Sequence, residues 1–213
     1  MTASGELIGI YGASGYGREV MPLVRSMRPA ADVVFIDDSA TASVMNGVAV
    51  KSFSEFLGME AAERRVSVAV ADAAARRILA ARCDDAGVEF FPVRADNVVV
   101  LHDVQLGAGS ILNPFVTLTS NIRIGKHFHA NLYAYVGHDC IIGDFVTFAP
   151  GVKCNGNIVI EDDAYIGTGA ILKQGRPGDP LVVGRGAVVG MGAVVTKSVQ
   201  SGATVIGNPA RPK

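Results

Sequence analysis

A histidine followed directly by an aspartate occurs twice in this chain, as His102-Asp103 and as His138-Asp139. A histidine with an ordinary pKa near ~6.5 can accept a proton at neutral pH, and an adjacent carboxylate can fix its tautomer and support the charged ring. Such a pair suits general-base catalysis, in which a side chain takes a proton from a reacting group. The two dipeptides lie thirty-six residues apart, and sequence alone does not tell which of them does chemistry.

A glycine-rich turn near the N-terminus suggests a second kind of chemistry. The apolar run Leu7-Ile8-Gly9-Ile10-Tyr11 leads directly into Gly12-Ala13-Ser14-Gly15-Tyr16-Gly17, and residues 18–27 then have the apolar spacing of a helix. A strand, a glycine-rich turn and a helix N-terminus can together hold phosphate through backbone N–H groups. The spacing G-x-x-G-x-G differs from the dinucleotide pattern G-x-G-x-x-G, and a tight turn without a ligand remains an alternative.

Two aspartates follow the second predicted strand. Residues 33–36 are apolar, and Asp37 and Asp38 come at their carboxyl end, about 20 residues past the glycines. An acidic residue at this place commonly contacts a ribose or sugar hydroxyl. A helix N-cap or a solvated turn is the alternative role.

Strands and helices alternate through this part of the chain, which predicts a small Rossmann-like parallel sheet. Two more strands and two helices are expected, at residues 66–71, 88–93, 53–59 and 72–86. The last of these helices should turn Ile78, Leu79 and Cys83 toward the core. A sheet of about four strands suits a mononucleotide better than NAD.

A different pattern begins after residues 94–97, so we expect an α/β domain over residues 1–95 and a second domain over residues 96–213. An apolar or small residue recurs there at every sixth position: Val100, Leu106, Leu112, Leu118, Ile124, Ala130, Val136, Ile142, Phe148, Cys154, Ile160, Ile166 and Leu172. The position four residues further on in each six is also small or apolar. This period predicts a parallel β-helix of hexapeptide repeats, in which three sixes form one triangular coil. Glycines that follow the repeat position, such as Gly107 and Gly125, are expected to form the corners with positive φ.

The six-residue register breaks once. After Leu172 the next inward positions are Val183, Val189 and Val195, so five residues are inserted. Residues 173–180 are rich in proline and glycine and predict a loop. Loops that leave a regular scaffold often carry function.

Composition narrows the class of protein. The 213 residues are 49% hydrophobic and 18% charged with a net charge of -1, which indicates a globular chain and speaks against a nucleic-acid partner. No apolar run approaches the ~20 residues of a membrane span, and residues 1–6 lack the pattern of a signal peptide. Cys83, Cys140 and Cys154 have no C-x-x-C spacing and predict buried, reduced thiols in a cytoplasmic protein.

Four motifs together give the chain a resemblance to a known family over nearly its whole length. They are Tyr11-Gly12-Ala13-Ser14-Gly15-Tyr16-Gly17, Ile36-Asp37-Asp38, Gly137-His138-Asp139-Cys140-Ile141-Ile142-Gly143-Asp144-Phe145 and Gly207-Asn208-Pro209-Ala210-Arg211. The chain is similar to bacterial nucleotide-sugar acetyltransferases that join a small Rossmann-like domain to a left-handed β-helix. These include the bacillosamine-pathway and perosamine N-acetyltransferases and the sialic acid O-acetyltransferase-like proteins. The left hand comes from the resemblance alone, since the general rule for parallel crossovers gives the right hand.

The resemblance implies an acetyl-CoA-dependent N-acetyltransferase that acts on the 4-amino group of a nucleotide-linked 4-amino-4,6-dideoxyhexose. GDP-perosamine is the first substrate we expect and a UDP-linked bacillosamine precursor the second, for surface glycan or lipopolysaccharide O-antigen biosynthesis. No metal is expected. The resemblance also implies a homotrimer that binds acetyl-CoA between subunits, and four side chains expected on the outer faces fit such an assembly: Thr117, Tyr133, Tyr135 and Phe145.

The resemblance assigns roles to individual residues. His138 is the implied catalytic base and Asp139 its orienting carboxylate, because His138 and not His102 lies in the string G-H-D-C-x-I-G-D-F. The nucleotide and sugar contacts are expected at Ser14, Gly15, Tyr16, Asp37, Asp38 and Ala71. The acetyl-CoA contacts are expected at Thr147, Thr168, Gly190 and Met191. The family often has glycine at the position of Ala71, and some members lack the insertion at 173–180.

Three other functions remain open from the sequence. The acetyl acceptor could be a sugar hydroxyl rather than an amine. A zinc lyase of the carbonic anhydrase type would need three histidines at a subunit interface, and His127 and His129, which we expect at the surface, could join His102 or His138 there. The third is a nucleotide-binding scaffold without catalysis.

Overall fold

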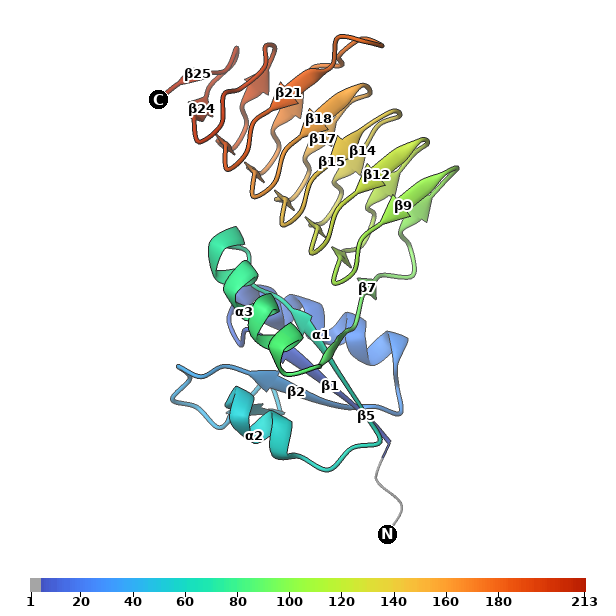
Figure 1. The fold of residues 1–213 in the computed structure, drawn as a ribbon, viewed down its shortest axis with the longest axis vertical. Helices are drawn as coiled ribbons and strands as arrows, with labels where there is room; N and C mark the ends of the chain where they lie inside the picture. The colour runs from blue at the N-terminus through green and yellow to red at the C-terminus, as the bar shows by residue number, and fades with distance from the viewer. Residues whose placement is uncertain (1–4) are drawn as a thin grey trace. The chain divides into compact units, whose positions relative to one another are not determined.

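The computed structural model describes residues 5–213, so most of the N-terminal stretch that lacks a signal-peptide pattern lies outside the described residues. The chain forms two compact units (Figure 1). The first ends at Val93 and the second runs from Arg94 to Lys213. Each unit is described by itself below.

The first unit is built on a six-stranded sheet in the order β3-β4-β2-β1-β5-β6. Its strands are β1 (Glu6–Tyr11), β2 (Asp32–Ile36), β3 (Val44–Met45), β4 (Val48–Lys51), β5 (Glu63–Val68) and β6 (Glu89–Phe90). Every neighbouring pair is parallel except β3 and β4. The predicted parallel α/β fold is confirmed, and the expected strand over 66–71 begins three residues earlier, at Glu63.

The prediction of about four strands missed the hairpin of β3 and β4. Asn46 and Gly47 join these strands with φ values of 49° and 73°. Two consecutive residues with positive φ make the tight turn that asparagine followed by glycine favours, so this dipeptide was a readable signal.

Three helices connect the strands: α1 (Gly15–Met27), α2 (Phe53–Gly58) and α3 (Ala73–Asp85). Helix α1 starts within the glycine-rich turn, three residues before the predicted start. The prediction that Ile78 faces the core is wrong, because its side chain is 69% exposed. Arg76 is buried instead, and its guanidinium donates to the backbone oxygens of Val70 and Ala71 at 2.7 and 3.1 Å.

The second unit is a parallel β-helix with three sheets, visible in Figure 1 as a stack of coils. Sheet X begins with β7 (Val93–Arg94), which spans the boundary between the two units. It continues with β10 (Ile111–Leu112), β13 (His129–Ala130), β16 (Thr147–Phe148), β19 (Tyr165–Ile166), β22 (Val188–Val189), β24 (Thr204–Ile206) and, antiparallel at its end, β25 (Arg211–Pro212). Sheet Y contains β8 (Val99–Val100), β11 (Thr117–Leu118), β14 (Tyr135–Val136), β17 (Lys153–Cys154), β20 (Ile171–Leu172) and β23 (Val194–Val195). Sheet Z contains β9 (Val104–Leu106), β12 (Ile122–Ile124), β15 (Ile141–Ile142), β18 (Ile158–Ile160) and β21 (Leu181–Val183).

The core of the β-helix matches the predicted repeat. Val136 pairs with Leu118 on one side and Cys154 on the other, each eighteen residues away. The inward positions from Leu112 to Leu172 are buried. Leu106 is an exception at 40% exposure, because its coil is the first of the stack and has no neighbour on one side.

The prediction that the repeat glycines make the corners with positive φ is wrong. Positive φ occurs two positions later, at residues such as Asp139 (57°) and Phe145 (58°). Gly107 and Gly125 serve close packing instead: a Cβ on Gly107 would lie 2.4 Å from the backbone carbon of Gly125. Neighbouring coils therefore approach each other too closely at these positions for any side chain.

Residues 173–180 form the predicted loop between β20 and β21, and Arg176 and Asp179 pair across it. A second irregularity follows β23, where Val199 pairs with Val183 after a step of only four residues from Val195. The described residues contain no helix that is long and apolar enough to span a membrane.

Candidate active site

His138 and Asp139 lie on the corner between sheets Y and Z, which we call the YZ corner. The imidazole Nδ1 is 2.7 Å from the Asp139 carboxylate, and about half of each side chain is exposed. Asp139 is a corner residue with a positive φ of 57°. Because Nδ1 faces Asp139, Nε2 is the ring nitrogen that can accept a proton from a ligand.

Asn121, one coil earlier, holds the other side of the carboxylate. Its amide donates to Oδ1 of Asp139 at 3.0 Å. The hydrogen bonds from His138 and Asn121 lower the pKa of Asp139 below its ordinary value. Asp139 therefore stays ionised at neutral pH and keeps its role as acceptor toward the imidazole.

Gly156, one coil later, forms the floor under the imidazole. A Cβ on Gly156 would lie 2.5 Å from Nε2 of His138, and its three nearest atoms would all belong to the His138 ring. The ring thus rests directly on the Gly156 backbone. We predicted no role for this glycine from the sequence, although its position eighteen residues after His138 is the signal that could have found it.

His102 and Asp103 occupy the same corner two coils earlier but have different partners. Arg123 donates to the Asp103 carboxylate at 2.9 Å and to the Asp103 backbone oxygen at 3.0 Å. The hydrogen bond to the carboxylate lowers the pKa of Asp103. Asp103 is therefore held by a permanent cation rather than by an imidazole.

The prediction that His127 and His129 lie at the surface is wrong. Their exposures are 2% and 1%, and His127 stacks on Phe145 with ring centroids 4.8 Å apart. Phe145 is itself 6% exposed, so it is not the outward aromatic that we expected. Across residues 5–213, no cluster of three or more histidine, cysteine, aspartate or glutamate side chains could hold a metal ion.

The glycine-rich turn of the first unit has the geometry of a close backbone loop. Helix α1 begins at Gly15, and the side chain of Ser14 makes no cap hydrogen bond. Ser14 and Gly15 are exposed and Tyr16 is half-buried. A Cβ on Gly17 would lie 1.8 Å from the oxygen of Gly12, so the turn packs too tightly there for any other residue. The start of a thirteen-residue helix is a place where backbone N–H groups can receive an anion.

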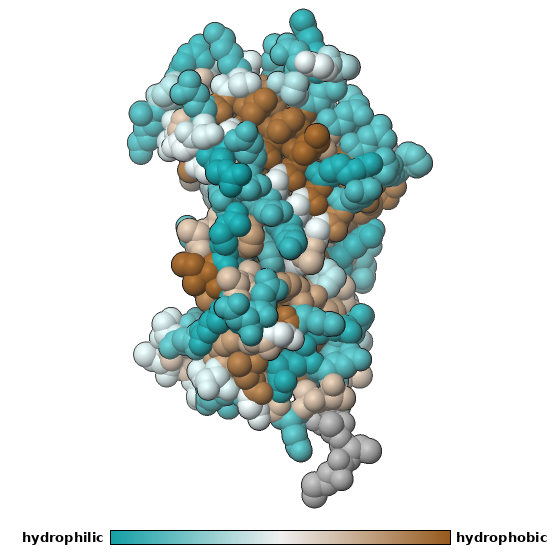
Figure 2. All heavy atoms as spheres, viewed as in Figure 1, coloured by the Kyte–Doolittle hydropathy of each residue, from teal (hydrophilic) through white to brown (hydrophobic). Residues whose placement is uncertain are grey.

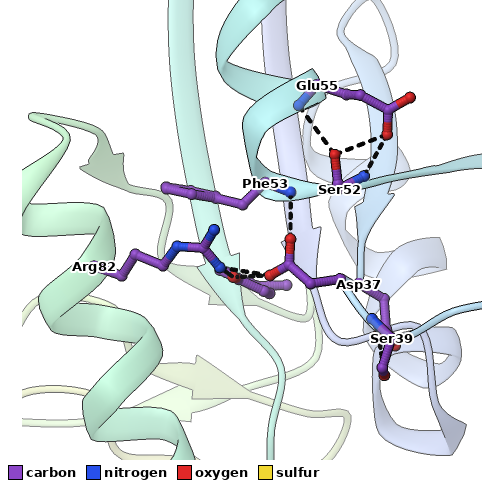
Figure 3. Close-up of polar contacts among 8 residues, drawn as sticks. Asp37, Ser39, Ser52, Phe53, Glu55 and Arg82 are labelled. Atoms are coloured by element: carbon purple, nitrogen blue, oxygen red, sulfur yellow. Dashed lines mark hydrogen bonds and ion pairs between the residues drawn. The ribbon is translucent and has the colours of Figure 1, made fainter.

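Asp38 is more constrained than its predicted ligand role suggests. Its Oδ1 accepts from the Phe53 N–H at 2.9 Å, and its Oδ2 accepts from the Tyr11 hydroxyl at 2.8 Å and from Arg82 at 2.5 Å. The guanidinium of Arg82 also lies over the Phe53 ring, 4.5 Å from its centroid (Figure 3). Burial acts to raise the pKa of Asp38, but these hydrogen bonds outweigh it and the pKa lies below its ordinary value.

Asp37 supports the turn itself. Its carboxylate accepts from the Ala13 N–H at 3.4 Å and from the N–H and hydroxyl of Ser39 at 3.0 and 2.7 Å. Burial acts to raise the pKa of Asp37, and the bonds from Ser39 and Ala13 lower it further than burial raises it. Ala71, at the end of the segment after β5, is exposed.

The residues expected to contact acetyl-CoA lie on another part of the β-helix. Thr147 is on sheet X and is 6% exposed. Thr168, Gly190 and Met191 follow sheet X strands at the next corner, and Met191 is 81% exposed. Within one chain the whole of sheet Y separates that corner from His138, so these residues do not converge.

A cavity of about 480 Å³ lies beside the loop at 173–180, further along the YZ corner. Three cations and one carboxylate line it: Lys173, Arg176, Lys197 and Asp179. The cavity therefore suits an anionic ligand. The sequence predicted the loop but not this collection of charge.

The fold and the site together are those of a class of acyltransferases. Its features are a histidine–aspartate pair on an exposed corner of a hexapeptide β-helix and an α/β unit with a glycine-rich turn. The first unit matches the PglD N-terminal domain family over residues 7–83. The GDP-perosamine N-acetyltransferase of Escherichia coli O157:H7 is 48% identical over 210 residues, which cover 96% of this chain and 95% of that protein.

Two solved structures extend the comparison. WeeI from Acinetobacter baumannii AYE is 55% identical, with a TM-score of 0.96 over 98% of this chain and 100% of that one. The acetyltransferase domain of PglB from Neisseria gonorrhoeae FA1090, solved with acetyl coenzyme A, is 27% identical, with a TM-score of 0.85 over 97% of this chain and 98% of that one. The chain belongs to the bacterial nucleotide-sugar N-acetyltransferases that carry a left-handed β-helix.

Proposed function

We propose that this protein transfers the acetyl group of acetyl-CoA to the 4-amino group of a nucleotide-linked 4-amino-4,6-dideoxyhexose, with GDP-perosamine as the first candidate. The hydrogen-bonded pair of His138 and Asp139 is the observation that carries the proposal. The 48% identity with a GDP-perosamine N-acetyltransferase over nearly the whole chain supports the choice of sugar. The product would enter surface glycan synthesis, including lipopolysaccharide O-antigen. Three buried free cysteines fit a cytoplasmic location.

The reaction follows from the geometry of the pair. The amine nitrogen attacks the thioester carbon, Nε2 of His138 accepts the proton that the amine loses, and the C–S bond breaks to release CoA. Asp139 accepts the Nδ1–H and stabilises the imidazolium that forms. The proton on Nε2 can then be given to the departing thiolate, which restores the neutral ring.

The first unit would hold the nucleotide. We expect the diphosphate at Ser14, Gly15 and Tyr16, which lie at the start of α1. Asp37 remains a candidate for a hydroxyl contact, because its Oδ2 accepts only the long bond from the Ala13 N–H at 3.4 Å. The Oδ2 of Asp38 already accepts from both Tyr11 and Arg82, and its Oδ1 accepts from the Phe53 N–H. We therefore assign Asp38 to shaping this edge of the sheet, and Ala71 to its wall.

The basic cavity would hold the phosphates of CoA. Four successive coils of the YZ corner carry these residues at the same position, two residues after the inward residue of sheet Y: His138, Gly156, Gln174 and Lys197. With strands about 4.8 Å apart, Lys197 lies three coils, roughly 14 Å, from His138. A thioester at His138 can thus run along the corner toward Arg176 and Lys197.

A homotrimer would bring the remaining acetyl-CoA contacts to the site. Thr168 and Met191 lie on a different corner from His138, so a neighbouring copy must present them if one ligand is to touch both. Sheet Z also carries outward apolar residues on adjacent strands, Ile141, Val159 and Val182. Figure 2 shows apolar side chains gathered on the β-helix unit. Light scattering at micromolar concentration should give three copies, and a monomer would contradict this part of the proposal.

A screen of nucleotide-linked amino sugars with acetyl-CoA, followed by free thiol release, tests the function. We expect turnover with GDP-perosamine and formation of an amide, which hydroxylamine does not cleave. Turnover only with hydroxyl acceptors would identify an O-acetyltransferase, and no turnover with any sugar would support a binding scaffold. Activity that follows added zinc would support the lyase alternative.

The cavity has its own test. Arg176→Ala and Lys197→Ala should raise the KM for acetyl-CoA and leave the KM for the sugar nucleotide unchanged. The effect should shrink with dephospho-acetyl-CoA, which lacks one phosphate. Arg185→Ala serves as the control, because Arg185 is a cation that pairs with Asp162 on another corner.

A further inference from the structure

The Gly156 backbone packs directly against the ring that carries the proposed base atom. The Nε2 atom of His138 lies against this glycine with no room for a side chain between them. Asn155 is the residue directly before it and is half-buried at the same corner. Its side chain and its backbone both make contacts with neighbouring coils.

The side chain of Asn155 joins three consecutive coils. Its Oδ1 accepts from the Tyr135 hydroxyl at 2.7 Å in the coil before, and its Nδ2 donates to the Leu172 oxygen at 2.7 Å in the coil after. Burial raises the pKa of Tyr135, so this hydroxyl stays protonated and donates. The amide is thus held at both ends.

The backbone of the same turn is tied to the catalytic corner. The buried Cys140 thiol donates to the Asn155 oxygen at 3.2 Å. The Asn157 N–H donates to the His138 oxygen at 2.9 Å. A Cβ on Gly137 would lie 2.8 Å from the Asn155 carbonyl carbon, so the two turns are in direct contact.

We propose that Asn155, held by the Tyr135 hydroxyl, is a positioning residue that sets the place of the His138 imidazole through Gly156. Loss of the amide would free the 155–156 turn to shift, and the ring would shift with it. A displacement of about 1 Å at a catalytic group can cost roughly 10²-fold in rate. The inference rests on the proposed acetyl transfer and deepens it, because Asn155 would act on the base through the Gly156 backbone.

The chain offers a matched control at Asn113. The Asn113 amide donates to the Ala130 oxygen at 3.2 Å. This bond is equivalent to the one from Asn155 to Leu172, because in both the acceptor lies seventeen residues after the asparagine, in the next coil. Asn113 follows strand β10 of sheet X and lies on a different corner. Asn113→Ala should therefore remove a comparable link between coils without moving His138.

The experiment measures kcat, both KM values and the thermal midpoint for Asn155→Ala, Tyr135→Phe, their double variant and Asn113→Ala. We expect Asn155→Ala to lower kcat by about 10- to 100-fold with both KM values within about twofold. Tyr135→Phe should lower kcat less and add nothing in the double variant, since its hydroxyl acts through the amide. Asn113→Ala should lower the thermal midpoint and leave kcat unchanged. A wild-type kcat in Asn155→Ala, or an equal loss in Asn113→Ala, would overturn the proposal.

Imidazole NMR spectra of the substrate-free protein separate this inference from the proposed function. The His138 ring signals should shift in Asn155→Ala and stay unchanged in Asn113→Ala. That result would support the positioning role even if the wild-type protein acetylated no sugar, which would count against the function alone. Unchanged His138 signals in Asn155→Ala would overturn the positioning role.

Discussion

The two histidine–aspartate corners of the β-helix begin from the same residues and differ in what stacks around them. Asp139 receives the His138 imidazole and the neutral Asn121 amide, whereas Asp103 receives the guanidinium of Arg123. The residue that corresponds to Arg123, thirty-six positions later, is Val159. One apolar residue in place of a cation thus leaves Asp139 available to its histidine.

The two corners also differ in the residue that follows each histidine by one coil. Gly156 lies one coil after His138, and Ser120 lies one coil after His102. Only a glycine permits the close approach of Nε2, which lies 2.5 Å from where a Cβ on residue 156 would stand. In a stacked fold, the chemistry of a dipeptide therefore depends on residues about eighteen and twenty positions away.

Removal of the two histidines should separate the corners most strongly. General-base catalysis is typically worth about 10² to 10⁴ in rate. His138→Ala should lower kcat by that factor while both substrates still bind, and His102→Ala should change kcat little. Steady-state kinetics with both substrates varied measures this. A larger loss in His102→Ala would move the active site two coils toward the first unit.

A side chain added at Gly156, directly under the His138 imidazole, should have the next largest effect on kcat. In Gly156→Ala the three atoms nearest to the new methyl group all belong to the His138 imidazole, and this half-exposed ring can turn away toward solvent. We expect kcat to fall by roughly 10²-fold with little change in thermal stability. Ser120→Ala, at the equivalent place under His102, is the control. Normal kcat in Gly156→Ala would show that the ring position carries no part of the rate.

A cation at residue 159 should make the His138 corner resemble the His102 corner. Val159→Arg places a guanidinium twenty residues after Asp139, as Arg123 stands after Asp103. Competition for a hydrogen bond to a charged group is worth about 1.5 kcal/mol, which corresponds to roughly a tenfold fall in kcat. Val159→Met, long but uncharged, should keep kcat near that of the wild type. If both variants lose activity equally, or if Val159→Arg no longer assembles by light scattering, competition for Asp139 does not explain the loss.

The reverse change at the His102 corner should have the smallest effect. Arg123→Val removes the partner that lowers the pKa of Asp103, so that pKa should return toward its ordinary value. A lowered pKa in the folded state stabilises the fold above the unfolded pKa, and this stabilisation is lost as pH falls through the folded pKa. Unfolding followed by urea from pH 7 down to pH 3 should therefore depend less on pH in the variant, with kcat at neutral pH unchanged.

Periodic features of the sequence predicted most of the architecture. Inward residues such as Val136 and Cys154 repeat with the coils, so the β-helix could be inferred before any contact was known. The shared motif around His138 favoured it over His102. By contrast, the burial of His127 and the exposure of Ile78 depend on which element covers each face, and residue type does not fix that.

The partners of the two aspartates were also beyond the sequence. A carboxylate after a histidine has the same local chemistry at residues 103 and 139, and only the stacking register shows that Arg123 reaches one of them. Asn155 and Gly156 were missed as well, although the spacing of eighteen residues from His138 was a signal for Gly156. Their roles come from neighbouring coils rather than from adjacent residues.

The pH dependence of kcat/KM, compared with the titration of individual histidines, tests most directly whether His138 is the base. The acidic limb of kcat/KM reports the essential base of the free enzyme. NMR titration in the same buffer, with signals assigned from His138→Ala and His102→Ala, gives the pKa of each ring. We expect the acidic limb to coincide with the His138 titration and to be unaffected by His102→Ala. An acidic limb that follows His102, or that persists unchanged in His138→Ala, would contradict this role of His138.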